Sequence, residues 1–354
     1  MRITARRVLR GLGYLAAALV VAAAGAWYVS ADVRYLVRAG VEEAGILLRR
    51  RPITAVVADP ATDARTRGKL ELVLAARAFA ADSIGLAAGE SFTTFSPLHR
   101  DTLVLVLSAS RYDRLAEKLW TYPVVGSVPY KGFFSFDAAL DAARALERDG
   151  MDTYLRVSDA FSTLGWFNDP VLSTALQTDS VDLAATVIHE LLHNTLFVPG
   201  QVPFDESLAE FVGYHGAERF FQSRGEPRLA AAAAARWRDE VRLSHFWQGL
   251  YDQLEQLYAP GIAGAPLREE RQRVFRLAGA ELAGPVGHSL ETIDGARLAE
   301  EPINNAVVIA QRFYLTNLDS FDRLYRADHQ DLRTFVRDLV QRTRGSADPW
   351  SVLK

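Results

Sequence analysis

The segment HELLH at residues 189–193 restricts the fold and chemistry of this chain more than any other part of its sequence. It lies in a helical pattern at residues 182–197, in which apolar residues repeat at helical spacing. Four helical residues turn the chain through about 400°, so His189 and His193 project from one face, roughly 40° apart. Both imidazoles can therefore reach one metal ion, and Glu190, about 100° round the helix, can hold a metal-bound water. This layout is typical of zinc hydrolases. The alternative is a chance match to a short pattern.

A second helical pattern follows a break at residues 198–200. Two helices joined by a short turn are antiparallel neighbours, which brings Glu206 close to His193. We therefore predict that Glu206 is the third ligand of a His2Glu zinc site with water in the fourth position. Alternatively, it is an ordinary first-turn glutamate favoured by the helix dipole. Glu210, one turn further along, is predicted to accept the outer N–H of a ligand histidine. His215 lies about 180° from Glu206 round the helix, which favours a packing or surface role.

The two motifs, HExxH at residues 189–193 and DExxAE at residues 205–210, resemble those of gluzincin metallopeptidases. The third zinc ligand of these enzymes is the glutamate of an Asn-Glu-x-x-Ala type motif, and Asp205 departs from this pattern by replacing the asparagine. More specifically, the chain resembles the bacterial putative aminopeptidase family of zincin type. That family is often found as predicted lipoproteins, whereas this chain has no cysteine for lipid attachment. The resemblance spans most of the chain after residue 32 and also rests on residues 122–126, 130–134, 162–170, 204–207 and 304–306.

The resemblance implies peptide-bond hydrolysis with one zinc ion per chain. Glu190 would take a proton from the zinc-bound water and pass it to the leaving amine. A second oxyanion donor is usual in gluzincins, and Tyr314 is the candidate in this sequence, ahead of His245 and His288. A tyrosine at such a position is more often part of the core, which is the alternative interpretation.

Zincins place a substrate-binding edge strand before the active-site helix, where a peptide adds as a further strand. Residues 163–167, with Gly165 and Trp166, are the candidate for this strand, and a buried aromatic turn is the alternative. An aminopeptidase also needs an anionic group for the free α-amine of its substrate, and Asp169 is the candidate. The motifs do not separate an aminopeptidase from a zinc endopeptidase. A non-catalytic, membrane-anchored binding protein that keeps the metal is a third hypothesis, which the intact Glu190 disfavours.

The composition agrees with an ordinary folded enzyme. Of 354 residues, 49% are hydrophobic and 23% charged, and the net charge is −3, which suits one sizeable core or two lobes. This balanced charge argues against nucleic acid as a partner. The absence of cysteine excludes disulfides and thiolate zinc sites, and it is compatible with any compartment.

The N-terminus predicts a membrane anchor. An uncharged stretch at residues 11–31, rich in Ala, Val and Leu, follows four arginines, which are Arg2, Arg6, Arg7 and Arg10. About twenty such residues span a bilayer core, and the arginines should stay on the cytoplasmic side. We therefore predict a single-pass protein of the bacterial inner membrane with its catalytic domain in the periplasm. The alternative is a signal peptide that is cleaved near Ala31 and releases a secreted protein.

The rest of the chain predicts an α+β fold, with a zincin-like metallopeptidase domain at residues 32–354. Helices are expected at 33–51, 61–84 and 138–148, and strands of a small mixed sheet at 102–107, 123–130 and 152–157. After residue 182 the pattern is helical nearly to the end. We thus expect an α/β lobe at about 52–180, a helical lobe at about 181–354, and the HELLH helix at their junction.

Overall fold

The computed structural model describes most of the chain, which divides into two compact units, residues 1–49 and 50–354. The first unit contains α2 (Ala31–Arg49), which confirms the helix expected at residues 33–51. The anchor predicted at residues 11–31 lies almost entirely outside the described residues. Among the residues that are described, no helix is both long and apolar enough to span a membrane. The described residues are 14, 25, 28, 31–98, 104–122, 126–158, 170–259, 261–327, 330–346 and 348–353.

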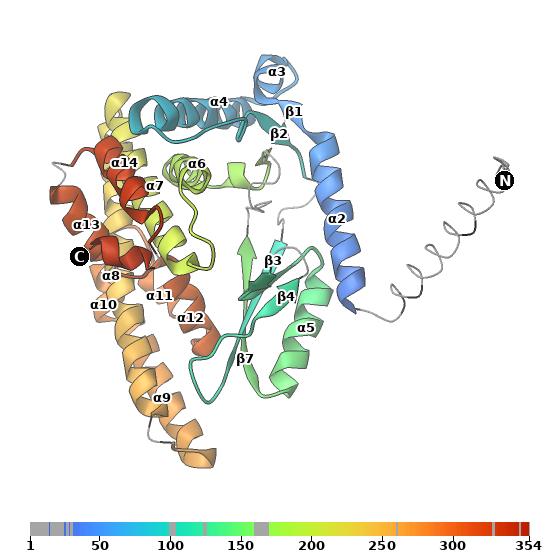
Figure 1. The fold of residues 1–354 in the computed structure, drawn as a ribbon, viewed down its shortest axis with the longest axis vertical. Helices are drawn as coiled ribbons and strands as arrows, with labels where there is room; N and C mark the ends of the chain where they lie inside the picture. The colour runs from blue at the N-terminus through green and yellow to red at the C-terminus, as the bar shows by residue number, and fades with distance from the viewer. Residues whose placement is uncertain are drawn as a thin grey trace, which may run out of the picture. The chain divides into compact units, whose positions relative to one another are not determined.

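A three-stranded antiparallel sheet forms the α/β part of the second unit (Figure 1). Its middle strand is β3 (Val104–Arg111), which pairs with β6 (Tyr130–Phe133) and β7 (Met151–Ser158). The β3 strand is buried along its whole length except for its last residue. The reason is that α5 (Phe136–Arg148) and α12 (Asn305–Tyr314) both pack against it. A nearly continuous apolar strand is expected where helices cover both faces of a sheet.

The α+β class is confirmed, but the single mixed sheet expected from the sequence is wrong, because the strands form several small sheets. The stretch predicted as one strand at residues 123–130 instead contributes to β6 and to β5 (Gly126–Val128), which pairs with β4 (Trp120–Tyr122). Gly126 has a φ of +78°, a left-handed conformation that interrupts an extended strand. A separate mixed sheet contains β1 (Arg51–Pro52), β2 (Thr94–Ser96) and β8 (Val171–Leu172).

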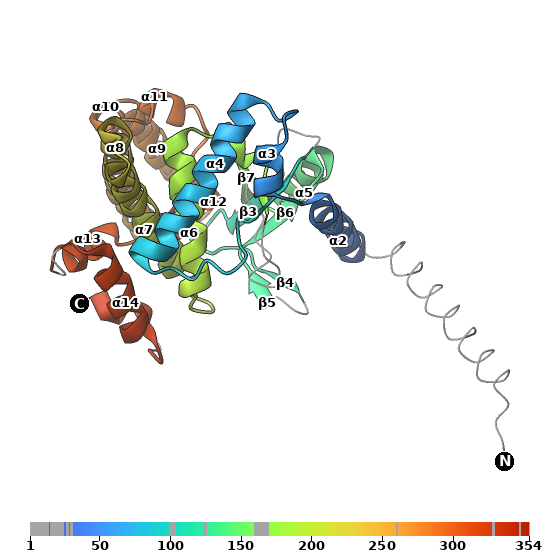
Figure 2. The ribbon, with the colours of Figure 1, turned by 90° about the horizontal axis from the view of Figure 1, so that it is seen from above.

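The α12 helix joins the sheet to the helical lobe. It packs against β3 and β7 and also against α7 (Val202–Ser223) and α8 (Pro227–Tyr258) (Figures 1 and 2). The side chain of its N-cap, Asn304, accepts a hydrogen bond from the backbone N–H of Val307. The Asn304 amide also donates to the backbone oxygen of Thr153 on β7 at 2.9 Å. One side chain therefore fixes both the start of α12 and its position on the sheet.

The remaining elements are mostly helices, as the sequence predicts. The α4 helix (Ala64–Phe79) continues into the π-helical turn η1 (Ala80–Ile84), which matches the helix expected at residues 61–84. Large aromatic side chains dominate the fully buried core of the helical lobe, namely Trp247, Phe204, Phe211, Phe221, Phe321 and Phe335. The other elements are α3 (Ile53–Ala58), η2 (Ala175–Gln177), α9 (Gly264–Ala283), α10 (Pro285–Ser289), α11 (Gly295–Leu298), α13 (Leu318–Ala327), α14 (Leu332–Thr343) and η3 (Pro349–Leu353).

The HELLH motif lies on α6 (Ser180–Thr195). This helix begins at the N-cap Asp179, whose carboxylate accepts hydrogen bonds from the backbone N–H groups of Val181 and Asp182. The turn after α6 includes Gly200, which has a φ of +80° and so adopts the left-handed conformation that favours glycine. The α7 helix follows directly, and the two helices form the predicted antiparallel pair.

Two glycines of α7 allow it to pack closely against α6. A Cβ atom on Gly213 would lie 2.9 Å from the carbonyl oxygen of Ala185 and 3.3 Å from the Cβ of His189. A Cβ atom on Gly216 would lie 2.9 Å from the side chain of Ile188. Larger residues would push the two helices apart, because interiors are close-packed. These glycines therefore bring the carboxylates of α7 within reach of the HELLH histidines.

Candidate active site

The three predicted ligands, His189, His193 and Glu206, lie together between α6 and α7. The Nε2 atoms of the two histidines are 3.2 Å apart. One carboxylate oxygen of Glu206 is 3.3 Å from Nε2 of His189, and the other is 3.8 Å from Nε2 of His193. One ligand atom from each residue lies within 4.8 Å of the others. A single cation can therefore contact all three side chains.

The spacing of these atoms fits tetrahedral zinc. Zinc binds imidazole nitrogen and carboxylate oxygen at about 2.0–2.2 Å, so two ligand atoms of a tetrahedral ion lie roughly 3.3–3.5 Å apart. The separations of 3.2 Å between the histidines and 3.3 Å between His189 and Glu206 are close to this spacing. Two imidazoles and one carboxylate are also a donor set that zinc accepts. The residues present therefore fit this ion.

The electrostatics of the site favour a cation. Burial alone lowers the pKa of His189, but the hydrogen bond to Glu206 and the charges of Glu210 and Glu190 outweigh it and raise the pKa to about 9. Burial raises the pKa of Glu206, but its hydrogen bonds to His189 and His193 outweigh that effect and hold the pKa well below its usual value. The carboxylates that hold a proton on His189 attract a divalent cation in the same way.

Glu210 lies beside the second ring nitrogen of His189, as predicted, but it does not form the predicted hydrogen bond. Its Oε1 is 3.7 Å from Nδ1 of His189, which is too long for one. Burial raises the pKa of Glu210. Burial and the charge of Glu210 together raise the pKa of Glu240, on α8, to about 8. The half-buried Glu210 thus lies between His189 and a second acidic side chain whose pKa it raises.

Glu190 is half-buried, and its negative charge acts on both His189 and Tyr130. Within the described part of the chain, its carboxylate forms neither a hydrogen bond nor an ion pair. A carboxylate next to the ligand histidines that has no such partner among the described residues is available to accept a proton from a water molecule.

Asp205, which replaces the asparagine of the gluzincin pattern, is only 3% exposed. Its Oδ1 accepts a hydrogen bond from the backbone N–H of Val198 at 3.0 Å, which ties the turn after α6 to α7. Its Oδ2 is buried without a partner among the described residues. Burial raises the pKa of Asp205 to about 7, which favours its neutral carboxyl. A neutral carboxyl has nearly the shape of the asparagine amide, and Oδ1 of Asp205 accepts the backbone hydrogen bond as an amide oxygen would.

Tyr314 approaches the site from the end of α12, where it meets Arg156 of β7. Nη2 of Arg156 donates a hydrogen bond to the Tyr314 hydroxyl oxygen at 3.2 Å, and its guanidinium carbon lies 5.5 Å from the centre of the Tyr314 ring. Burial and the charge of Glu206 raise the pKa of Tyr314 well above its ordinary value. Burial and the charges of Glu206 and Glu190 also raise the pKa of Tyr130, on β6. Both phenols therefore keep their proton, and each can donate a hydrogen bond.

Tyr130 and Arg156 were not predicted as site residues, although they lie in the segment 130–134 that supports the resemblance and in the strand expected at 152–157. Strand pairing places them on one face of the sheet. Tyr130 pairs with Ser108 of β3, Arg156 pairs with Val106, and residues two apart on a strand share a face. The available signal was the alternation of Asp152, Tyr154 and Arg156 on a strand, which predicts a polar face at residue spacing two. Nothing in the sequence shows that this face meets α12.

The other histidines considered as alternatives lie outside the ligand group. The ring of His215 packs between aromatic rings, with centroids 4.4 Å from Phe211 and 5.0 Å from Tyr325. Its predicted packing role is therefore confirmed. The exposed His245 lies 2.5 Å from a carboxylate oxygen of Asp319.

The proposed substrate residues Gly165, Trp166 and Asp169 lie outside the described residues, as does the candidate edge strand at residues 163–167. Their roles stay predictions.

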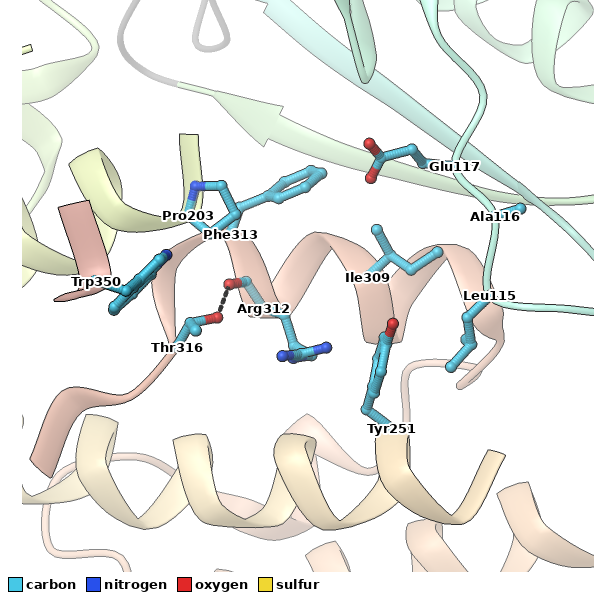
Figure 3. A pocket seen from close by; sticks show the side chains of 10 residues that line it. All are labelled: Leu115, Ala116, Glu117, Pro203, Tyr251, Ile309, Arg312, Phe313, Thr316 and Trp350. Atoms are coloured by element: carbon cyan, nitrogen blue, oxygen red, sulfur yellow. Dashed lines mark hydrogen bonds between the residues drawn. The ribbon is translucent and has the colours of Figure 1, made fainter. Parts of the chain in front are cut away.

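A cavity of about 580 Å³ lies where α12 meets α8 and the first turn of α7 (Figure 3). The backbone N–H of Thr316, which lines it, donates to the hydroxyl oxygen of Ser207 at 3.1 Å. Ser207 follows Glu206 on α7, and Thr316 lies two residues after Tyr314. This bond therefore fixes the end of α12 against α7. The cavity is lined by Leu115, Ala116, Glu117, Pro203, Tyr251, Ile309, Arg312, Phe313, Thr316 and Trp350.

Comparison with known proteins identifies the family. A model of the family described as "Putative aminopeptidase" matches residues 34–347, and the chain belongs to this family. The match includes the α6–α7 pair, the three-stranded sheet and α12, and it confirms the aminopeptidase part of the resemblance. No curated protein and no solved structure matches the chain.

Proposed function

We propose that this member of the family is a zinc-dependent aminopeptidase with a zincin-type site, in which His189, His193 and Glu206 bind the metal. The observation that carries the proposal is the group of one ligand atom from each of these residues within 4.8 Å. The aminopeptidase family supports peptides as the substrate class. When bound, zinc would lower the pKa of a coordinated water and polarise the scissile carbonyl.

The side chains around this group have separate roles in the proposed reaction. Glu190 takes a proton from the attacking water and delivers it to the leaving nitrogen, which needs a carboxylate with no competing partner. The Tyr314 hydroxyl donates a hydrogen bond to the carbonyl oxygen as negative charge develops there. Arg156 donates to the oxygen of that hydroxyl, so the Tyr314 proton remains available for the substrate. Glu210 increases the negative potential at His189.

The free amine of the substrate needs an anionic partner, because a buried ammonium without one is costly. Asp169 remains the proposed partner, and residues 163–167 remain the proposed edge strand beside which the peptide lies.

Metal analysis and peptide cleavage test the proposal together. Purified protein is expected to contain about one zinc per chain, to lose activity with a chelator and to recover it with zinc. An unblocked peptide should be cleaved from its N-terminus much faster than the N-acetylated peptide. Cleavage of internal bonds in acetylated peptides would instead indicate an endopeptidase. A protein that binds zinc but cleaves neither peptide would contradict the proposed reaction.

We also propose that residues 11–31 anchor the protein in the bacterial inner membrane, with the catalytic domain in the periplasm. The support is the arginine-flanked apolar stretch. Retention in membranes at alkaline pH, together with an intact N-terminus, is the expected result. A mature protein that starts just after Ala31 would show cleavage and secretion instead.

A further inference from the structure

Arg156 lies on the face of the sheet that meets α12. The same face carries Asp152, two strand positions before Tyr154 and four before Arg156. Asp152 is already occupied, because it pairs with Arg271 and accepts a hydrogen bond from the backbone N–H of Asn305 at 2.9 Å. The nearest acidic residue of the strand therefore does not serve Arg156.

Most N–H donors of Arg156 are not used by any described residue. It is half-buried, and its partner for hydrogen bonding among the described residues is the Tyr314 hydroxyl. No carboxylate in that part of the chain forms an ion pair with it. A guanidinium has five N–H donors in a planar fork that matches a carboxylate. A half-buried guanidinium without an anion is unfavourable, so an anionic ligand would be bound well at this position.

Arg156 is also close to the proposed reaction centre. Tyr314 accepts a hydrogen bond from Arg156, and the charge of Glu206 raises the pKa of Tyr314. The charges of Glu206 and Glu190 raise the pKa of Tyr130, and the charge of Arg156 lowers it. The α6–α7 side of the site presents carboxylates, which repel a peptide carboxylate, whereas Arg156 on the sheet side attracts one.

We propose that Arg156 forms a carboxylate-binding subsite and that the preferred substrates are short peptides whose free C-terminal carboxylate reaches it. This inference rests on the proposed aminopeptidase function and adds the substrate class. A dipeptide or tripeptide bound with its scissile carbonyl near Tyr314 has its C-terminal carboxylate only a few residues away, since an extended chain spans about 3.3–3.6 Å per residue. Longer peptides would place their carboxylate beyond Arg156.

The zinc-loaded full-length protein is tested with the peptides Leu-Ala and Leu-Ala-Ala and with the C-terminal amides of both. The free acid of the better peptide should have a kcat/KM about 10- to 100-fold higher than its amide, as expected for a charge-assisted hydrogen bond. Arg156→Gln should remove this preference by raising KM for the acid alone, while any loss of kcat from the broken hydrogen bond to Tyr314 should be similar for the acid and the amide. Arg156→Lys should keep part of it, because lysine retains the charge but not the fork.

Arg312 provides a matched control, because it also stacks on a tyrosine. Its guanidinium carbon lies 3.8 Å from the ring centre of Tyr251, at the cavity between α12 and α8 (Figure 3). Arg312→Gln should preserve the preference for free acids. Equal kcat/KM values for acids and amides in the wild type would overturn the proposal. So would an Arg156→Gln variant that lowers kcat/KM by the same factor for acid and amide and so keeps the acid preference, because Arg156 would then only position Tyr314.

A binding measurement separates this proposal from the proposed function. In a Glu190→Gln background, calorimetry with Leu-Ala and its amide reports carboxylate recognition without turnover. Tighter binding of the acid that is lost on adding Arg156→Gln supports the subsite, even if the wild type cleaves none of the peptides. Equal binding of acid and amide overturns it, whether or not the protein is a peptidase.

Discussion

The candidate site has two halves that are built differently. The helix half consists of His189, His193 and Glu206 on an adjacent pair of helices, and its polar atoms contact one another at 3.2–3.8 Å. The sheet half consists of Tyr314 and Arg156 with Tyr130, which come from α12, β7 and β6. Arg156 and Tyr314 are joined by a hydrogen bond at 3.2 Å and by the stacking of the guanidinium on the ring.

This difference agrees with the two tasks that the halves are proposed to perform. Holding a metal requires ligand atoms at fixed spacing, and two closely packed helices provide it. Recognising a substrate requires donors that are not already satisfied by the protein, and the sheet half offers a tyrosine proton and an arginine fork. Substitutions in the helix half should therefore change metal content, and those in the sheet half should change turnover at constant metal content.

The largest effect is expected for His193→Ala. Removing one of three ligands should abolish stoichiometric zinc binding and with it all measurable peptide hydrolysis, because an ion with two protein ligands is held much more weakly. Elemental analysis after dialysis measures the metal content.

His215→Ala is the control for that variant, because it removes a histidine of α7 outside the ligand group. It should keep about one zinc while lowering the free energy of unfolding by about 1–3 kcal/mol, since its ring packs against Phe211 and Tyr325. A His193→Ala protein that retains a full equivalent of zinc would show that the helix half does not hold the metal.

Glu190→Gln should keep the metal and lower kcat by about 10³-fold, because it removes the proton carrier and leaves the ligands intact. Glu206→Gln is the matched variant, with the same chemical change at a proposed ligand. It should weaken zinc binding first, which a competition titration with a chelator detects. Equal loss of zinc in both variants would mean that the roles of base and ligand are assigned wrongly.

The sequence predicted the helix half and missed most of the sheet half for a physical reason. Helical periodicity and a short turn place His189, His193 and Glu206 with respect to one another without knowledge of the rest of the fold. Tyr130 and Arg156 share a face of the sheet only through the register of β6 and β7 on β3, which depends on non-local pairing that alternation in one strand does not specify. The predicted single mixed sheet was wrong for the same reason.

Tyr314→Phe should sharpen the contrast between the halves. Loss of one donor to the developing oxyanion is expected to lower kcat by about 10²-fold with unchanged zinc content. Because the pKa of Tyr314 is raised well above its ordinary value, the wild type should show no loss of activity from ionisation of this phenol up to pH 10.

Tyr154→Phe, on the same face of the sheet, should have little effect on kcat. A Tyr314→Phe variant with wild-type kcat would remove Tyr314 from the reaction.

The smallest effect is expected behind the helix half, at Glu240. Burial and the charge of Glu210 raise the pKa of Glu240 from 4.5 to about 8, so the folded protein binds this proton more tightly than the unfolded chain does. The stability that this proton provides is complete below about pH 4.5 and is lost as the pH rises through about 8. Glutamine does not titrate, so Glu240→Gln should raise Tm relative to the wild type by a few degrees at pH 8.5 and by less at pH 5.

Glu281→Gln, at an exposed position of α9, should show no such trend. Equal differences in Tm at the two pH values would mean that the pKa of Glu240 is not raised in the folded protein. The negative charge of Glu210 beside His189 would then not reach Glu240.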